Sequence, residues 1–150
     1  MFRCVWTAPR SPSTSPRDLR WDGCFNVRDL GGLRAGDGAL VQRGALVRAD
    51  ALDALSEAGW RAVYDHGVRT LIDLRNDEER NVIDDGRAAV FGVERLHLPL
   101  DAIEVRSFWD AWTSGWQFGT PLYWGPHLLA FPERSARVLR AIARARPGGV

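Results

Sequence analysis

A short apolar run at residues 70–74, followed at once by a dense group of charged side chains, constrains the fold more than any other stretch. The run contains β-branched residues, which is typical of a buried strand in a parallel sheet. Gly67 is expected to end a helix just before it. Because ligands of open α/β sheets bind beyond the carboxyl ends of the strands, Asp73 and Arg75 are predicted at the mouth of a site. The alternative is that they form only a structural ion pair at the strand end.

A second buried strand is predicted over residues 44–49, with Arg48 near its end. Arg48 would then join Arg75 at the carboxyl edge of the same sheet. A helix over residues 57–66 and a half-exposed strand over residues 93–98 are also expected. Together these elements predict one α/β domain with a mostly parallel sheet flanked by helices.

Residues 19–33 place polar side chains between apolar anchors and end on the glycine pair Gly31-Gly32. The polar side chains are Asn26, Arg28 and Asp29. The two glycines permit a close approach of the backbone. One interpretation is a capped turn held by an Arg–Asp pair, and the other is a loop that contributes these side chains to a site.

The overall composition argues against several classes of function. The net charge is +1, so there is no basic field that would indicate a nucleic acid partner. No apolar run reaches the length of a membrane span, and the amino end has no apolar signal-peptide core, so the cytoplasm is the expected location. Cys4 and Cys24 lack paired spacing and the three histidines are far apart, so neither a metal site nor a cofactor is predicted.

Residues 101–123 form an insert with a high concentration of aromatic side chains. Trp109, Trp112 and Trp116 follow helical spacing and are predicted on one face of a helix. They either pack on the core or form a wall or lid over the site, since aromatic faces commonly line ligand pockets.

The two ends of the chain differ in character. Residues 1–18 are rich in Pro, Ser and Thr and are predicted to form a flexible tail. Near the other end a helix is predicted over residues 133–144, followed by a Pro-Gly turn and by Val150, which is expected to begin another buried strand. The predicted buried side of that helix consists of Ala136, Val138, Leu139, Ala141 and Ile142.

Three motifs occur in order along the chain. They are Asn26-Val27-Arg28-Asp29-Leu30-Gly31-Gly32, Gly44-Ala45-Leu46-Val47-Arg48, and Leu71-Ile72-Asp73-Leu74-Arg75 followed by Glu79. With these motifs, residues 19–150 resemble the bacterial tyrosine phosphatase family of the atypical dual-specificity, lipid-phosphatase-like type. Ala49 stands where that family usually has Ser. The resemblance implies a cysteine-phosphatase-like α/β fold.

This resemblance also implies a cysteine-dependent hydrolase of phosphate monoesters, acting on a phosphorylated protein or a phosphoinositide. In the family, a His-Cys-x-x-Gly-x-x-Arg loop follows a buried strand. Its Cys attacks the phosphorus, while its Arg and backbone amides bind the oxygens. No metal is required. The substrate-binding side chains implied here are Asn26, Arg28, Asp29, Arg48, Asp73 and Arg75.

That catalytic loop does not occur in this sequence. Cys24 is followed six positions later by Leu30 instead of Arg. Cys4 is followed by Arg10, but that stretch has no glycine and Pro9 lacks an N–H donor. The chain is therefore expected to be the truncated, inactive amino-terminal portion of such a phosphatase. The alternative is a non-catalytic phosphate-binding or interaction module whose anion ligands would be Arg28, Arg48 and Arg75.

Overall fold

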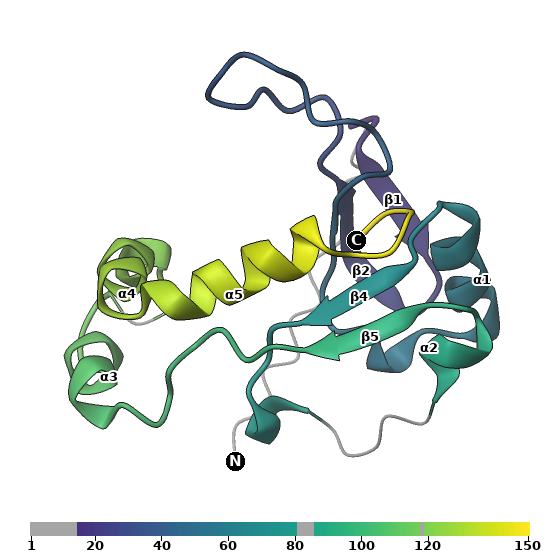
Figure 1. The fold of residues 1–150 in the computed structure, drawn as a ribbon. Coiled ribbons are helices and arrows are strands. Elements are labelled where there is room, and N and C mark those ends of the chain that lie inside the picture. Colours follow the sequence, from purple (N-terminus) through teal and green to yellow (C-terminus); the bar gives the residue numbers. More distant parts are fainter. Residues whose placement is uncertain (1–14, 81–85, 118) are drawn as a thin grey trace.

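The structure is a computed structural model that describes residues 15–80, 86–117 and 119–150. These residues form two groups of strands with helices beside them, which confirms the predicted α/β class (Figure 1). One group is an antiparallel sheet, and the other is a parallel pair. The parallel pair fits the predicted parallel sheet, whereas the antiparallel sheet is an addition to it.

The antiparallel sheet has the strand order β1 (Asp18–Trp21), β2 (Cys24–Asp29) and β3 (Val47–Arg48). Asp18, which the sequence assigned to the end of the tail, begins β1, and residues 1–14 of that tail lie outside the described residues. The second predicted strand, over residues 44–49, is reduced to the two residues of β3. It belongs to the antiparallel sheet, so the prediction that Arg48 and Arg75 share the edge of one sheet is wrong.

β1 and β2 form a hairpin in the stretch predicted as a turn or loop. The hairpin turns at Asp22-Gly23, where Gly23 has a φ of 87°. A Cβ at Gly23 would lie 2.0 Å from the carbonyl oxygen of Ala54, so only glycine fits there. Asp-Gly between apolar residues is a strong signal for a hairpin, and it is the feature from which this sheet could have been predicted.

α1 (Glu57–Asp65) lies where a helix was predicted and covers one side of the strands. The Ser56 hydroxyl accepts a hydrogen bond from the N–H of Gly59 at 3.1 Å, which caps the helix start. Gly67, with a φ of 97°, follows the helix end. Trp60 and Val63 are buried and form the core together with residues of the hairpin. A short 3₁₀ helix (Leu52–Ala54) joins β3 to this helix.

β4 (Thr70–Asp73) is the predicted strand of the central apolar run, and it pairs in parallel with β5 (Glu94–His97). A 3₁₀ helix (Asp77–Glu79) follows β4, and α2 (Arg87–Val90) precedes β5. β3 and β4 are not paired with each other.

Val150 lies between the edges of β3 and β4. Its N–H donates to the carbonyl of Ala45 at 3.1 Å, and its carbonyl accepts from the N–H of Val47 at 2.7 Å. The carbonyl of Gly149 accepts from the N–H of Arg69 at 2.8 Å, on the side of β4. These two residues therefore bridge the two groups of strands, at the position of a further strand parallel to β4.

The aromatic insert contributes α3 (Arg106–Thr113) and a 3₁₀ helix (Pro121–Tyr123), and α4 (Trp124–Ala130) follows it. These helices lie at the far end of α5 from the strands (Figure 1). Trp109 and Trp112 belong to α3, but Trp116 lies beyond its end and is 82% exposed. The prediction of one helix face for all three tryptophans is therefore wrong for Trp116. The helix ends at Thr113, and the backbone of Ser114 is already extended before Gly115, which has a φ of 114°.

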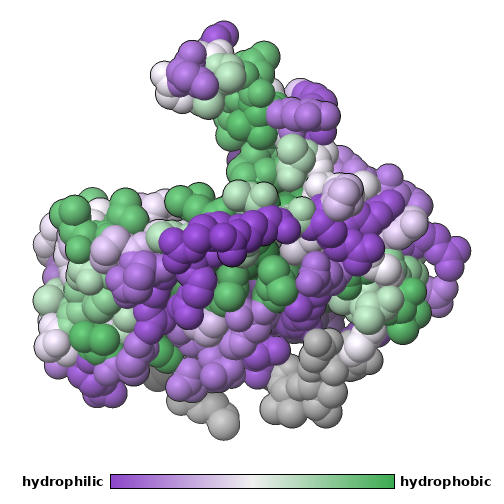
Figure 2. Space-filling model, in the orientation of Figure 1, coloured by the Kyte–Doolittle hydropathy of each residue, from purple (hydrophilic) through white to green (hydrophobic). Residues whose placement is uncertain are grey.

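α5 (Pro132–Ala143) is a helix as predicted, but its predicted buried side is not buried in this structure. Leu139 is 65% exposed. Val138 and Ile142 are half-buried and line a cavity that is described below. Figure 2 shows a hydrophilic band along α5 and hydrophobic side chains on the lobe of α3 and α4. Among the described helices, none combines the length and apolarity that crossing a membrane requires.

Candidate functional site

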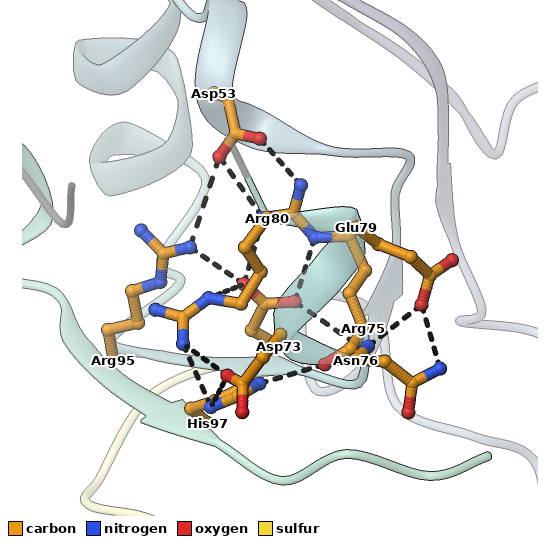
Figure 3. A network of polar contacts seen from close by, with 9 residues as sticks. Asp53, Asp73, Arg75, Asn76, Glu79, Arg80, Arg95 and His97 are labelled. Atoms are coloured by element: carbon orange, nitrogen blue, oxygen red, sulfur yellow. Dashed lines mark hydrogen bonds and ion pairs between the residues drawn. The ribbon is translucent and has the colours of Figure 1, made fainter. Parts of the chain in front are cut away.

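The carboxyl ends of β4 and β5 carry a network of ion pairs (Figure 3). Arg75 bonds two carboxylates at once: its Nη1 and Nη2 lie 2.5 and 3.1 Å from the Asp53 oxygens, and its Nε and Nη2 lie 3.0 and 2.9 Å from those of Asp73. Asp53 comes from the 3₁₀ helix after β3, so the network links the ends of β3 and β4. Both carboxylates hold the guanidinium in one plane and one orientation.

Asp73 also accepts a hydrogen bond from Arg95 Nη2 at 2.7 Å, and Arg80 Nε lies 3.7 Å from the same carboxylate. Burial favours the neutral carboxyl, but the hydrogen bonds from Arg75 and Arg95 outweigh it and hold the pKa of Asp73 well below its usual range. The hydrogen bond from Arg75 likewise holds the pKa of Asp53 below its usual value against burial. The two carboxylates are therefore ionised at neutral pH.

The turn after β4 is fixed by a reciprocal cap. Glu79 Oε2 accepts from the backbone N–H of Asn76 at 2.8 Å and from its side-chain amide at 3.0 Å. His97 Nδ1 lies 2.9 Å from Arg80 Nη1, which is a donor, so Nδ1 accepts and Nε2 donates to the carbonyl of Arg75 at 2.8 Å. The spacing from Asp73 through Arg75 to Glu79 thus specifies the shape of this turn.

Arg48 and Asn26 meet near the end of β3. Arg48 Nη2 donates to Asn26 Oδ1 at 2.9 Å, and both side chains are exposed. Asp50 Oδ1 accepts from the N–H groups of Phe25 and Asn26, each at 3.2 Å, and from the thiol of Cys24. Burial and then the Asp50 carboxylate raise the pKa of Cys24 to about 12, so this thiol stays protonated and is not a nucleophile.

Arg28 and Asp29 have partners other than the Arg48–Asn26 pair. Arg28 stands opposite Arg48 in the ladder, but its Nε lies 3.0 Å from Asp18 Oδ1 on the neighbouring strand β1. Asp29 is 2% exposed and accepts from the N–H of Gly31 at 2.7 Å and of Gly44 at 3.0 Å. Because β2 runs antiparallel to β3, Asp29 lies opposite Val47, away from the end of β3 that carries Arg48.

Asp29 holds the glycine pair in place. Burial would raise its pKa, but the amides of Gly31 and Gly44 outweigh burial and keep the pKa below its usual value. A Cβ on Gly31 would come within 2.5 Å of the Arg43 Cα, so this loop packs backbone against backbone. Asp29 thus caps the turn, as the structural interpretation expected, but the Arg–Asp pair of that interpretation does not form, because Arg28 pairs with Asp18.

A cavity of about 470 Å³ lies between β3 and β4 and is mostly apolar. Arg48, Asp73, Arg75 and Arg95 line its polar part, and Val150 occupies one end. Three of the six predicted site residues therefore line this cavity. Asn26 does not line it, but it accepts a hydrogen bond from Arg48, which does. The lining residues do not include Arg28 or Asp29.

Sequence reasoning did not identify Asp53, Arg95 or His97 as parts of this network. Arg95 and His97 alternate with apolar residues in the strand at residues 93–98, a pattern that suggested a solvent-facing side. Their position beside β4 follows only from the parallel register of β4 and β5, which cannot be derived from the sequence. Within the described residues, no group of His, Cys, Asp or Glu has an arrangement that could hold a metal ion.

The structure is an α/β fold with arginines near the carboxyl ends of its strands, where ligands of such folds bind. The tyrosine phosphatase family matches residues 19–144, and the chain therefore belongs to the tyrosine phosphatase family. This membership supports phosphatase chemistry on phosphorylated substrates. No curated protein matches the chain.

Proposed function

We propose that this chain is the amino-terminal portion of a cysteine-dependent phosphatase that hydrolyses phosphate monoesters of proteins or phosphoinositides. The proposal rests on the position of Val150, which is held by backbone hydrogen bonds between β3 and β4. A strand that continues from it in parallel with β4 would run through the cavity toward Arg48 and Arg75. A loop after that strand would place its cysteine and arginine beside them.

Two buried polar groups have no hydrogen-bond partner among the described residues, the Thr70 hydroxyl and the Trp60 indole N–H. Such groups are uncommon in folded proteins, because each costs about 1–3 kcal/mol. Both residues are among those that line the cavity, although these two atoms do not open onto it. They support a neighbour for β4 that the described residues do not supply.

Two arginines have different roles in this proposal. Arg75 is fully engaged by Asp53 and Asp73, so it fixes the shape of the edge. Arg48 is exposed, and its side chain donates to the neutral Asn26. Arg48 is therefore the stronger candidate for a direct bond to phosphate oxygens. Arg28 would contribute only by leaving Asp18, and Asp29 by shaping the glycine loop.

The proposal predicts no turnover by the 150-residue chain itself. Phosphate held by arginines still needs a thiolate in line with the phosphorus, and Cys24 is protonated and bonded to Asp50. We expect p-nitrophenyl phosphate hydrolysis at the buffer rate, with Cys24→Ser and Cys4→Ser unchanged. Thiol-dependent hydrolysis lost in Cys4→Ser would show that the Cys4 stretch is a working loop.

The test is the DNA that follows the codon for Val150. A coding stretch for His-Cys-x-x-Gly-x-x-Arg, in frame or after a frameshift, supports the proposal. The extended protein should then hydrolyse p-nitrophenyl phosphate, and a serine in place of the loop cysteine should abolish hydrolysis. A stop without any remnant of the loop contradicts it and favours a phosphate-binding module built on Arg48.

A further inference from the structure

A second cavity, of about 480 Å³, opens between the turn after β4 and the aromatic insert. It shares no lining residue with the cavity between β3 and β4. The residues that give it its chemistry are Glu79, Asp101, Trp109, Trp112 and Tyr123. The sequence indicates only an aromatic wall here, whereas the structure adds two carboxylates to it.

The aromatic wall is held in a fixed arrangement. Trp109 Nε1 donates to the carbonyl of Ala102 at 2.9 Å, and its ring centroid lies 5.0 Å from that of Tyr123. The ring of Trp112 lies 6.3 Å from that of Phe108, which itself packs edge-on against Trp109 at 5.4 Å. Each of these rings has a negative face, and two indoles and one phenol line one cavity.

Asp101 supplies a negative charge without a dedicated partner. The structure shows no hydrogen bond to its carboxylate among the described residues, although its backbone carbonyl accepts from Arg134 at 3.0 Å. The Arg134 guanidinium is itself paired with Glu104. Burial raises the pKa of Asp101, the charge of Glu79 raises it further, and His127 and Arg134 offset only part of this.

Glu79 and Asp101 act on the same small volume. Both line the cavity together with Tyr123. Burial raises the pKa of the Tyr123 hydroxyl, and the negative charges of Asp101 and Glu79 raise it further. Glu79 uses Oε2 for the cap on Asn76. The lining residues include no Arg or His, in a chain with twenty arginines. The cavity is therefore negative and aromatic, and it disfavours anions.

We propose that this cavity binds an organic cation, of the alkylammonium class, between the faces of Trp109, Trp112 and Tyr123 and beside Asp101 and Glu79. Aromatic faces attract ammonium groups within about 6 Å of the ring, and methylated ammonium ions lose little hydration on entry. The carboxylates add charge complementarity that a neutral ligand of the same shape cannot use. The site is independent of the proposed phosphatase function.

The test uses the 150-residue protein labelled with 5-fluorotryptophan and observed by ¹⁹F NMR. Choline chloride is the probe, 3,3-dimethyl-1-butanol is its neutral isostere, and NaCl controls for ionic strength. Choline should shift the signals of Trp109 and Trp112 saturably and leave that of Trp116 unmoved, with assignments from single Trp→Phe variants. The isostere should bind at least about 10-fold more weakly than choline, because it has no positive charge to interact with the aromatic rings and the carboxylates.

Two variants and a matched control connect the binding to the cavity. Asp101→Asn should weaken choline binding by about 10-fold, and Trp112→Leu should weaken it independently of charge. Asp110→Asn removes the same charge from an exposed position on α3 that does not line the cavity, and it should change nothing. Equal shifts from choline and its isostere, shifts reproduced by NaCl, absence of saturation, or equal losses in Asp101→Asn and Asp110→Asn would each overturn the proposal.

Discussion

At the scale of single residues, Asp73 is central to the ion network, because its carboxylate hydrogen-bonds both Arg75 and Arg95. Asp73→Asn keeps the shape of the side chain but leaves two partly buried guanidiniums with too little negative charge. We expect the free energy of opening, measured from the exchange of the β4 and β5 amides, to fall by about 3 kcal/mol. Native-state hydrogen exchange measures this loss. Asp77→Asn, at a side chain 82% exposed, is the control and should have little effect.

The same network sets a pH dependence. The pKa of Asp73 is lower in the folded chain than the unfolded value of about 3.9, so its contribution is complete above that pH. As the pH falls through the folded value, the contribution is lost. Protection of β4 should therefore decline in acid in the unmodified chain and decline less in Asp73→Asn. Equal acid sensitivity of the two proteins would contradict the role given to Asp73.

Cys24 gives a further prediction. A thiol pKa of about 12, against an ordinary 9.0, lowers the thiolate fraction at pH 8 by a factor of about 1000. In a Cys4→Ser background, the remaining thiol should react with Ellman's reagent at least about 100-fold more slowly than in the urea-unfolded chain. Fast, complete modification of the folded protein would show that the Asp50 contact does not hold in solution.

At the scale of elements, the β1–β2 hairpin depends on one glycine. Gly23→Ala would force a left-handed φ and drive a Cβ to 2.0 Å from the Ala54 carbonyl oxygen. Gly32→Ala faces the same backbone cost at a φ of 83°, with nothing within 4 Å, so it separates strain from collision. We expect Gly32→Ala to cost about 1 kcal/mol and Gly23→Ala at least about 2 kcal/mol more, measured by exchange of the β2 amides. Similar losses in both variants would show that the 3₁₀ helix at Leu52–Ala54 yields to the added methyl.

The elements that the sequence predicts are those with local signals. α1 has a serine cap, a spaced apolar face and a stopping glycine, and all three appear in the structure. β4 has an apolar run bounded by charge. The β1–β2 hairpin had its Asp-Gly signal, but the polar residues around it suggested a loop. The opposite error occurred at Trp116, because the helical spacing of the tryptophans continues past Thr113, where the helix ends.

The site is harder to predict than the elements, because its partners are distant in the chain. The sequence places Asp73 and Arg75 correctly at the carboxyl end of a strand. It wrongly assigns Arg48 to the same sheet, although Arg48 and Arg75 do line one cavity. It does not show that Arg75 forms a second ion pair with Asp53, or that Arg28 forms an ion pair with Asp18. Both outcomes depend on strand register and on the antiparallel direction of β2, which are properties of the assembled sheet.

At the scale of the whole molecule, the described residues leave much apolar surface in water. Leu139 on α5 is 65% exposed and Leu74 after β4 is 39% exposed, while the cavity between β3 and β4 is lined mostly by apolar side chains. At roughly 25 cal/mol per Å² of apolar surface, contacts missing on this scale rival a net stability of about 5–15 kcal/mol. The lobe of α3 and α4 meets the strands mainly through α5 (Figure 1).

We therefore expect the isolated 150-residue chain to unfold with low cooperativity and to self-associate. Thermal unfolding followed by far-UV and near-UV circular dichroism should give two broad transitions that do not coincide. Sedimentation should show association that rises with concentration, since exposed apolar patches of this kind bind each other. Leu139→Gln should reduce association without changing the far-UV spectrum, while Arg140→Gln, at an exposed polar position on the same helix, should not reduce it. One sharp transition, common to both signals in a monomeric sample, would contradict the open cavity as a source of instability.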